Sequence, residues 1–496
     1  MPNDSPTDAT STREQIYVGL VVLLIVVTSG RLWLPQLGAS FWLDETGTAW
    51  LVQGDFWTAM SRSVQFQGGH TLFVVVEWLV KQFTGLREIG LRMPSVLGMA
   101  GATYFIYLLG RRLYDNWVGL FGALFFVCLP AVAFAASDAR PYALALMGLT
   151  GSTLALVRWL DEQNTGRAVV YAATFAATVL LHYLFLLALV SHATYLLHWK
   201  RAGRRLEPRN LAIVVGFGVL FLLPGLPAFL RILGERSSLS NPYPSEPHDI
   251  FNFVLPPDLV QLLAVAFLIA ALVVGTRLRT AGYRAGMLTL LVAWVAIPAF
   301  TLYEISTRTA TYVLVPRYFL MVTPALALLV AAGVRQLRAT GAQIVVMGLV
   351  AILAFRSFAT TTHTLEDWRA AAATERSIVT DASTPVLLFS GLIEANQISW
   401  LSDPEKASYL NAPAAMYPMN GRLIPTPFRL EGDGVAYMNR IVEEELILSP
   451  RFVLVTRGAD PYKAWLDSVV SSAGFVGSPV ASYNGEIIIY EYSRGA

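Results

Sequence analysis

The feature that most constrains this chain is a series of long apolar runs separated by short basic segments. About 20 consecutive apolar residues cross the hydrocarbon core of a bilayer, and runs of this kind recur between Ile16 and Phe355. The whole chain is 55% hydrophobic and only 14% charged, which is far more apolar than a soluble protein. The sequence therefore predicts a polytopic α-helical membrane protein, retained in the plasma (inner) membrane.

Basic clusters predict the orientation, because Lys and Arg concentrate in cytoplasmic loops. Five clusters lie between apolar segments: Arg111-Arg112, Arg158 with Arg167, Lys200 to Arg209, Arg277 to Arg284, and Arg335 with Arg338. Placing all five in the cytoplasm gives about eleven spans, with the N-terminus inside and the C-terminus outside. Beyond the first run, single spans are predicted near residues 92–109, 117–134, 141–157, 211–230, 258–275, 286–303, 316–333 and 341–356.

Two apolar segments do not fit a single span. Val169–Trp199 is too long for one helix and has cytoplasmic charge at both ends, so we expect two short spans that meet at His182-Tyr183. Thr71–Phe83 is too short to cross and carries Glu77. We expect a juxtamembrane helix there, lying flat on the outer surface.

The composition changes after Phe355, where the apolar runs shorten to strand length. Strands are predicted at 385–390, 451–456 and 486–492, with a helix at 462–472 and a turn at Asn484-Gly485. Residues 1–356 are therefore expected to form the transmembrane domain, and residues 357–496 a small soluble α/β domain on the outer face. The sequence predicts no nucleic-acid partner, and its single cysteine, Cys128, allows no disulfide.

The first outer loop holds the strongest candidates for chemistry. Asp44 and Glu45 follow the first apolar run directly, and acids beside a bilayer are costly unless they are used. His70 and Arg92 belong to the same loop, so proton transfer beside an anion is chemically feasible there. The alternatives are that the acids cap a short interfacial helix, that His70 faces water, and that Arg92 anchors the second span.

Two further groups are expected at the same face. Asp138, Arg140 and Tyr142 surround Pro141, a residue that suits the first turn of a helix. Capping and an ion pair would explain these residues equally, and a divalent metal shared by Asp44 and Asp138 is left open. Arg317 and Tyr318 open a later span from outside, where an Arg reaches a lipid phosphate or simply extends to the headgroups. His182 and Tyr183 are assigned to packing or to the polarity of a helix turn.

Several of these motifs, in this order, resemble the family 39 type of GT-C glycosyltransferases. The group includes protein O-mannosyltransferases and the aminoarabinose transferases of lipid A. The motifs are Phe41–Glu45, Gly68–Phe73, Leu91–Ser95, Tyr107–Arg112, Asp138–Leu144, and more thinly Pro316–Tyr318 and Glu366–Arg369. The chain departs from the family where His-Pro-Pro is common, since it has His70-Thr71-Leu72.

The resemblance implies a polyprenyl-phosphate-linked sugar as donor and a lipid, glycan or protein as acceptor. It places the catalytic carboxylate at Asp44, with Glu45 beside it and Asp138 in the second outer loop. In the expected mechanism a carboxylate takes the proton of the acceptor hydroxyl and the anomeric centre is inverted. Arg317, Arg92 and Arg140 are expected to hold the donor phosphate, and His70, Tyr142 and Tyr318 to contact the substrates.

Two other function classes compete with transfer. A lipid or glycolipid transporter (a flippase) has the same composition, but its ionisable residues tend to lie near the bilayer midplane, whereas the acids here cluster at one face. A binding module, in which the C-terminal domain does the work, is the third alternative.

Overall fold

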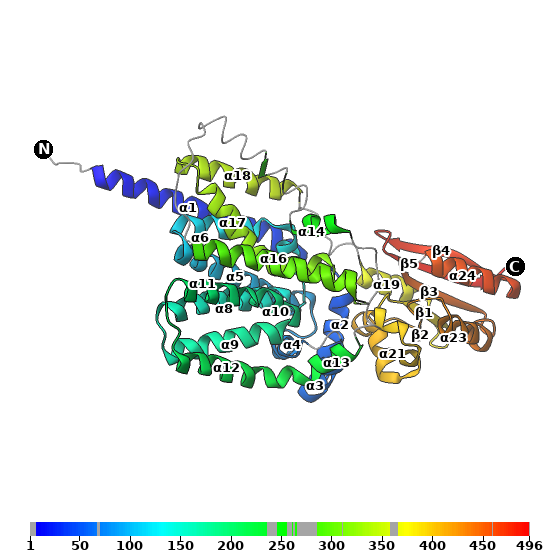
Figure 1. Ribbon diagram of the computed structural model, residues 1–496. Helices are drawn as coiled ribbons and strands as arrows, with labels where there is room; N and C mark the ends of the chain where they lie inside the picture. The colour runs from blue at the N-terminus through cyan, green and yellow to red at the C-terminus, as the bar shows by residue number, and fades with distance from the viewer. Residues whose placement is uncertain are drawn as a thin grey trace.

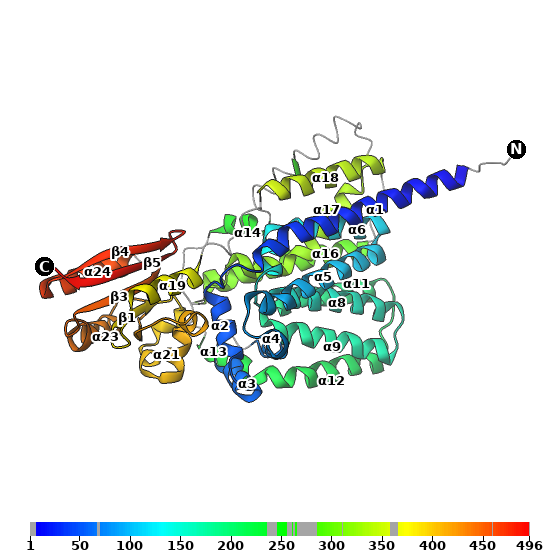
Figure 2. The same ribbon diagram turned by 180° about the vertical axis from the view of Figure 1, so that it is seen from behind.

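The computed structural model describes residues 6–66, 70–235, 246–254, 260, 263–264, 285–309, 311–357, 366–458 and 460–495. Figures 1 and 2 show long helices packed side by side, with a smaller region that contains a sheet at one end. The two termini lie at opposite ends of the molecule.

The first region consists of helices. In chain order they are α1 (Pro6–Trp33), η1 (Leu34–Gln36), α2 (Leu43–Val52), α3 (Phe56–Gln65), α4 (Thr71–Thr84), α5 (Glu88–Leu113), α6 (Asn116–Val127), α7 (Pro130–Ala136), α8 (Tyr142–Asp161), α9 (Thr165–Leu181), η2 (Tyr183–Phe185), α10 (Leu186–Leu189), α11 (Ser191–Arg201), α12 (Pro208–Leu222), η3 (Leu223–Gly225), α13 (Leu226–Glu235), α14 (Pro247–Val254), α16 (Ala285–Arg308), η4 (Pro316–Val322), α17 (Thr323–Val334) and α18 (Thr340–Ser357).

Six helical stretches among the described residues are long and apolar enough to cross a membrane, or seven if α6 and α7, bent by 73° at Pro130, form one span. The helices α9 and α18 are apolar but shorter. The predicted span at 258–275 falls largely outside the described residues, as does the basic cluster from Arg277 to Arg284. The polytopic helical class is confirmed, while the count of eleven and the orientation stay predictions.

Both unusual apolar segments have the predicted local structure. The helix α4 is a separate helix of 14 residues and is not among the helices long enough to span. The helix α9 ends at Leu181, and the chain breaks at His182 before η2 and α10 begin. This break brings the turn after α9 to the end of the bundle where α4 and α2 lie.

The C-terminal region is an α/β domain built on one five-stranded sheet of order β2-β1-β3-β5-β4. The strands are β1 (Pro385–Phe389), β2 (Arg422–Pro425), β3 (Arg451–Arg457), β4 (Phe475–Tyr483) and β5 (Ile487–Arg494). Strand β1 runs parallel to both β2 and β3, whereas β5 pairs antiparallel with β3 and β4. The predicted turn joins β4 to β5 through residues 484–486, and Asn484 and Gly485 have the positive φ that Asn-Gly favours in tight hairpin turns.

Helices surround this sheet. They are α19 (Trp368–Ile378), η6 (Ile393–Asn396), α20 (Ile398–Ser402), α21 (Pro404–Leu410), α22 (Ala412–Met416), α23 (Asp433–Ile441), the π-helical turn η7 (Val442–Leu446), α24 (Asp460–Val470) and η8 (Ser471–Ala473). The sequence predicted β1, β3, β5 and α24 but did not identify β2, β4 or the short helices between β1 and β2.

The chain has two large apolar cores, and the second one unites distant parts of the sequence. Phe41, Leu43 and Trp50 from the first loop are buried together with Leu387 of β1 and Tyr409 of α21. The indole of Trp50 also donates a hydrogen bond of 3.0 Å to the Ser408 hydroxyl. The first loop therefore packs as part of the C-terminal domain, across the boundary predicted at residue 356.

Candidate active site

The two acids of the first loop begin helix α2. Trp42 is the extended residue before the helix, and Asp44 and Glu45 lie in the first turn, where the helix dipole favours negative charge. The two neighbours have different surroundings. Glu45 is fully buried, whereas the Asp44 side chain keeps 18% of its exposure.

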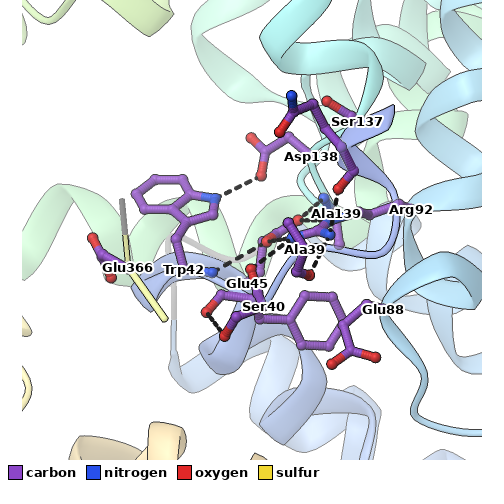
Figure 3. A network of polar contacts seen from close by, with 12 residues as sticks. Ala39, Ser40, Trp42, Glu45, Glu88, Arg92, Ser137, Asp138, Ala139 and Glu366 are labelled. Carbon is purple, nitrogen blue, oxygen red and sulfur yellow. Dashed lines mark hydrogen bonds and ion pairs between the residues drawn. The ribbon is translucent and has the colours of Figure 1, made fainter. Parts of the chain in front are cut away.

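Glu45 is enclosed by donors on every side (Figure 3). Its Oε1 accepts from Arg92 Nε at 2.8 Å and from the Ala139 amide at 2.7 Å. Its Oε2 forms the ion pair with Arg92 and accepts from the Trp42 amide at 3.3 Å. A buried carboxylate with this many partners is held as a structural anion, because losing any donor would leave buried charge uncompensated.

Arg92 is the centre of the same network and is also fully buried. A guanidinium has five N–H donors. Those of Arg92 are used by Glu45 and by backbone carbonyl oxygens of the preceding loop, on Gln36, Leu37, Ala39 and Ser40. This geometry leaves Arg92 no exposed donor for a phosphate. We therefore correct its predicted role: Arg92 holds the loop that carries Asp44.

Asp44 faces two guanidinium groups instead. Its Oδ2 lies 3.2 Å from Arg317 Nη1 and 3.8 Å from Arg140 Nη2. Burial raises the pKa of Asp44, but Arg317, Arg140 and Arg457 together outweigh burial and hold that pKa below its usual value. Asp44 is therefore ionised at neutral pH.

Asp138 is the opposite case. Burial, together with the charge of Glu45, raises the pKa of Asp138 well above its usual value, so the neutral acid is favoured. Its Oδ1 accepts from the indole N–H of Trp42 at 2.9 Å (Figure 3), and its Oδ2 has no hydrogen-bond partner among the described residues. Asp138 thereby fixes Trp42, the residue that begins the helix of Asp44.

The two cations beside Asp44 come from separate parts of the chain. Arg140 follows Asp138 in the short connection before α8, is 7% exposed, and approaches the Asp44 carbonyl and the Thr48 hydroxyl. Arg317 lies in η4 with 36% of its side chain exposed, near the rings of Trp42 and Tyr318. Two guanidinium groups that converge on one carboxylate form a site suited to an anion.

The three predicted substrate-contacting residues lie near one another. Tyr142 and His70 are both within ring-contact distance of His182, at 5.1 and 4.7 Å between centroids, and Tyr318 is 5.9 Å from it. The sequence assigned His182 to packing and so missed the residue around which the others gather. Its position in the break after α9 was the signal available.

The C-terminal domain also reaches the site. Glu366 Oε2 accepts from the Leu43 amide at 2.8 Å, at the first residue of α2, and its Oε1 pairs with Arg457 Nε at 2.8 Å. Glu366 and Leu43 are 323 residues apart in sequence, so no local pattern could have predicted this contact.

A divalent metal shared by Asp44 and Asp138 fits this arrangement poorly. Two guanidinium groups already balance the charge of Asp44, and Asp138 favours its neutral form, whereas a carboxyl group binds Mg²⁺ or Ca²⁺ in its ionised form. Within the described part of the chain, no group of three or more His, Cys, Asp or Glu residues is arranged to hold a metal.

Comparison with known proteins identifies the fold. Residues 71–227 match the family model of dolichyl-phosphate-mannose-protein mannosyltransferase, which covers less than half of the chain. Among solved structures, ArnT from Cupriavidus metallidurans is similar in its apo state (12% identity, TM-score 0.59) and bound to undecaprenyl phosphate (13%, 0.56). Each alignment covers 95% of this chain and 98% of ArnT.

The oligosaccharyltransferase of Archaeoglobus fulgidus, tethered to an acceptor peptide, is also similar (11% identity, TM-score 0.52), over 97% of this chain and 74% of that one. No curated protein matches in sequence. The findings show a GT-C fold of the protein mannosyltransferase and ArnT type, a fold of glycosyltransferases, as the resemblance predicted.

Proposed function

We propose that this chain transfers a sugar from a polyprenyl-phosphate donor to an acceptor hydroxyl, with Asp44 as the general base. The observation that carries the proposal is the contrast at the start of α2. Glu45 is closed in by donors, whereas Asp44 is partly exposed and faces Arg140 and Arg317. A base must reach its substrate, and only the Asp44 side of the turn offers such access.

The donor phosphate is proposed to bind where the two guanidinium groups converge. Arg317 is partly exposed, and a planar guanidinium suits two oxygens of one phosphate. Support for a polyprenyl phosphate comes from the similar ArnT structure, which is bound to undecaprenyl phosphate. The leaving phosphate departs as an anion, so it needs cations and no general acid.

Phosphate binding also makes Asp44 a better base. The same cations that lower the pKa of Asp44 in the empty site would be shared with the phosphate once the donor binds. Their hold on the carboxylate weakens, and its pKa rises toward the ordinary value. Asp44 then takes the proton of the acceptor hydroxyl as that oxygen attacks the anomeric carbon. A single displacement inverts the anomeric centre.

Glu45, Arg92 and Asp138 act through position. Arg92 ties the loop before α2 to Glu45, and Asp138 fixes Trp42.

We also keep the predicted orientation, with the N-terminus in the cytoplasm and the C-terminal domain outside the inner membrane. The positive-inside rule assigns the described basic clusters to the cytoplasm, and all of them precede the C-terminal domain in the sequence.

The test is turnover in detergent micelles. Purified protein is incubated with radiolabelled undecaprenyl-phosphoryl sugars and a membrane extract as acceptor, and product is followed beside Asp44→Asn. A transferase forms product without a bilayer, and the variant does not. A flippase, which needs two leaflets, forms none in micelles but moves a fluorescent undecaprenyl-phosphoryl sugar across vesicles. That second pattern would replace the proposal.

A further inference from the structure

A group of aromatic and imidazole side chains lies beside the proposed phosphate site. We call it the imidazole cluster and define it as His70, Tyr142, His182, Tyr183 and Tyr318. The rings of His70 and His182 lie 4.7 Å apart at a tilt of 30°, and His70 also stacks with Tyr183 at 6.4 Å. The five residues come from four separate parts of the chain.

The centre of the imidazole cluster is polar and buried. His182 is 3% exposed, yet neither ring nitrogen has a hydrogen-bond partner among the described residues. Nδ1 of His70 is likewise buried and unpartnered within that part of the chain. A buried polar atom without a partner loses the hydrogen bonds it would make to water and is destabilising. Such atoms at a functional site call for a ligand or water.

The other buried histidine shows that this is not the rule for the chain. His192 is 2% exposed, but its Nε2 contacts the Thr153 hydroxyl and its Nδ1 the Tyr171 hydroxyl, each at 3.0 Å. The fold thus satisfies an imidazole that has only a packing role. His182 differs because neither of its ring nitrogens has a hydrogen-bond partner within the described part of the chain.

The imidazole cluster includes partly exposed side chains and adjoins the proposed phosphate site. His70, Tyr183 and Tyr318 are each half-buried, and the rings of His70 and Tyr318 contact that of His182. Tyr318 directly follows Arg317, whose guanidinium lies 5.8 Å from the Tyr318 ring. A group attached to a phosphate at Arg317 would therefore lie against these rings.

The charge of the imidazole cluster limits what it binds. Burial, with the neighbouring His182 and Arg140, lowers the pKa of His70 well below its usual value. Burial, with the charges of Arg140 and Arg317, lowers the pKa of His182 to about 3, so both rings are neutral at pH 7. A neutral imidazole has one donor and one acceptor nitrogen, which matches a hydroxyl. An ammonium group has donors only. It would be repelled by the positive charges of Arg140 and Arg317, and Asp44 would not compensate, because its own charge is already balanced by these two residues.

We infer that the imidazole cluster is the sugar subsite, in which His182 hydrogen-bonds hydroxyls of an uncharged sugar while Tyr142, Tyr318 and His70 contact its ring. The inference rests on the proposed function, because it places the sugar of the same donor. It goes further by naming His182 as the recognising residue and by excluding amino sugars.

The test compares binding of undecaprenyl phosphate with binding of undecaprenyl-phosphoryl mannose, glucose and 4-aminoarabinose to the purified protein. His182→Phe keeps the ring and removes both nitrogens. His192→Phe is the matched control, since it makes the same change at a buried histidine whose nitrogens are satisfied. Arg317→Ala tests whether Arg317 binds the phosphate group of these ligands.

At least one neutral sugar is expected to bind the unsubstituted protein about tenfold more tightly than undecaprenyl phosphate alone, and the amino sugar less tightly than that neutral one. His182→Phe should abolish this difference but leave binding of undecaprenyl phosphate unchanged. His192→Phe should keep the difference.

Two outcomes would overturn the inference, and two others would count against the proposed function on which it rests. Preference for the amino sugar, or a neutral-sugar preference that survives in His182→Phe, would show that His182 does not recognise the sugar. Failure of undecaprenyl phosphate to bind, or binding unaffected by Arg317→Ala, would count against the proposed phosphate site. Failure of the sugar subsite is thus seen in the comparison among the sugar-linked ligands, whereas failure of the phosphate site is seen in the binding of undecaprenyl phosphate itself.

Discussion

Asp44 and Glu45 are neighbours in one helical turn, but they face two different regions of the molecule. On the Glu45 side, Arg92 and the backbone around it satisfy the carboxylate completely. On the Asp44 side, two guanidinium groups approach a partly exposed carboxylate, and Asp138 keeps an oxygen without a partner among the described residues.

This difference suggests a structural role for the Glu45 side and a chemical role for the Asp44 side. A closed network of buried charges fixes a loop because any rearrangement leaves a charge unpaired. An incompletely satisfied group of charges is suited to a ligand that completes it. We therefore propose distinct roles for the two acids of the motif, and substitutions on the two sides should have different kinds of effect.

The largest effect is expected on the Asp44 side. Asp44→Asn keeps the size of the side chain but cannot take a proton, so turnover should fall about 10²- to 10⁴-fold. The melting temperature should remain near that of the unsubstituted protein, because the partly exposed carboxylate contributes little to stability. Both are measured on the purified protein. A fully active Asp44→Asn would end the assignment of the base.

On the Glu45 side the loss should be in stability. Arg92→Met and Glu45→Gln each leave an unpaired buried charge or donor, which costs about 3–5 kcal/mol, and thermal unfolding in detergent should show it. Arg92→Lys should not restore stability, because it lacks the planar fork. A stable Arg92→Met with weakened donor binding would instead return Arg92 to the phosphate site.

Arg317 should affect the donor and the pH profile. Arg317→Ala should raise the KM for donor about 10- to 100-fold, the worth of a charged hydrogen bond, and Arg317→Lys should recover part of it. Because Arg317 helps to lower the pKa of Asp44, Asp44 stays ionised, and kcat/KM of the unsubstituted protein stays high, at a lower pH than in Arg317→Ala. In Arg317→Ala the acidic fall in kcat/KM should move to higher pH. The same pH profile in both proteins would show that Arg317 does not affect the pKa of Asp44.

A smaller effect is expected where the C-terminal domain holds α2. Glu366→Gln keeps an acceptor for the Leu43 amide but loses the ion pair with Arg457. We expect kcat to fall severalfold while the donor KM stays constant.

Tyr417→Phe removes the acceptor of the Phe41 amide and should lower the free energy of unfolding by about 0.5–1.5 kcal/mol. Equal, large losses in both would mean that the loop depends on this domain more than on Arg92.

The sequence predicted the parts of this molecule that local patterns encode. Apolar length and basic loops identified the helical region, and Asn484-Gly485 identified the last hairpin. The grouping of Asp44, Asp138 and Arg317 followed from their common position at span ends. The division of labour between Asp44 and Glu45 could not be predicted, because which side of the turn is buried depends on Arg92 and the Ala139 amide.

The contact between Glu366 and the start of α2 has a consequence for biosynthesis. Ribosomes add residues in order, so the loop with Asp44 leaves the translocation machinery long before Glu366, and before the strands that share its core. The helix that carries the proposed base lacks these contacts until nearly the whole chain is made. If Asp44 is the base, we expect a truncated chain to insert its helices in the membrane but remain inert, so that no partly synthesised copy consumes the proposed lipid-linked donor.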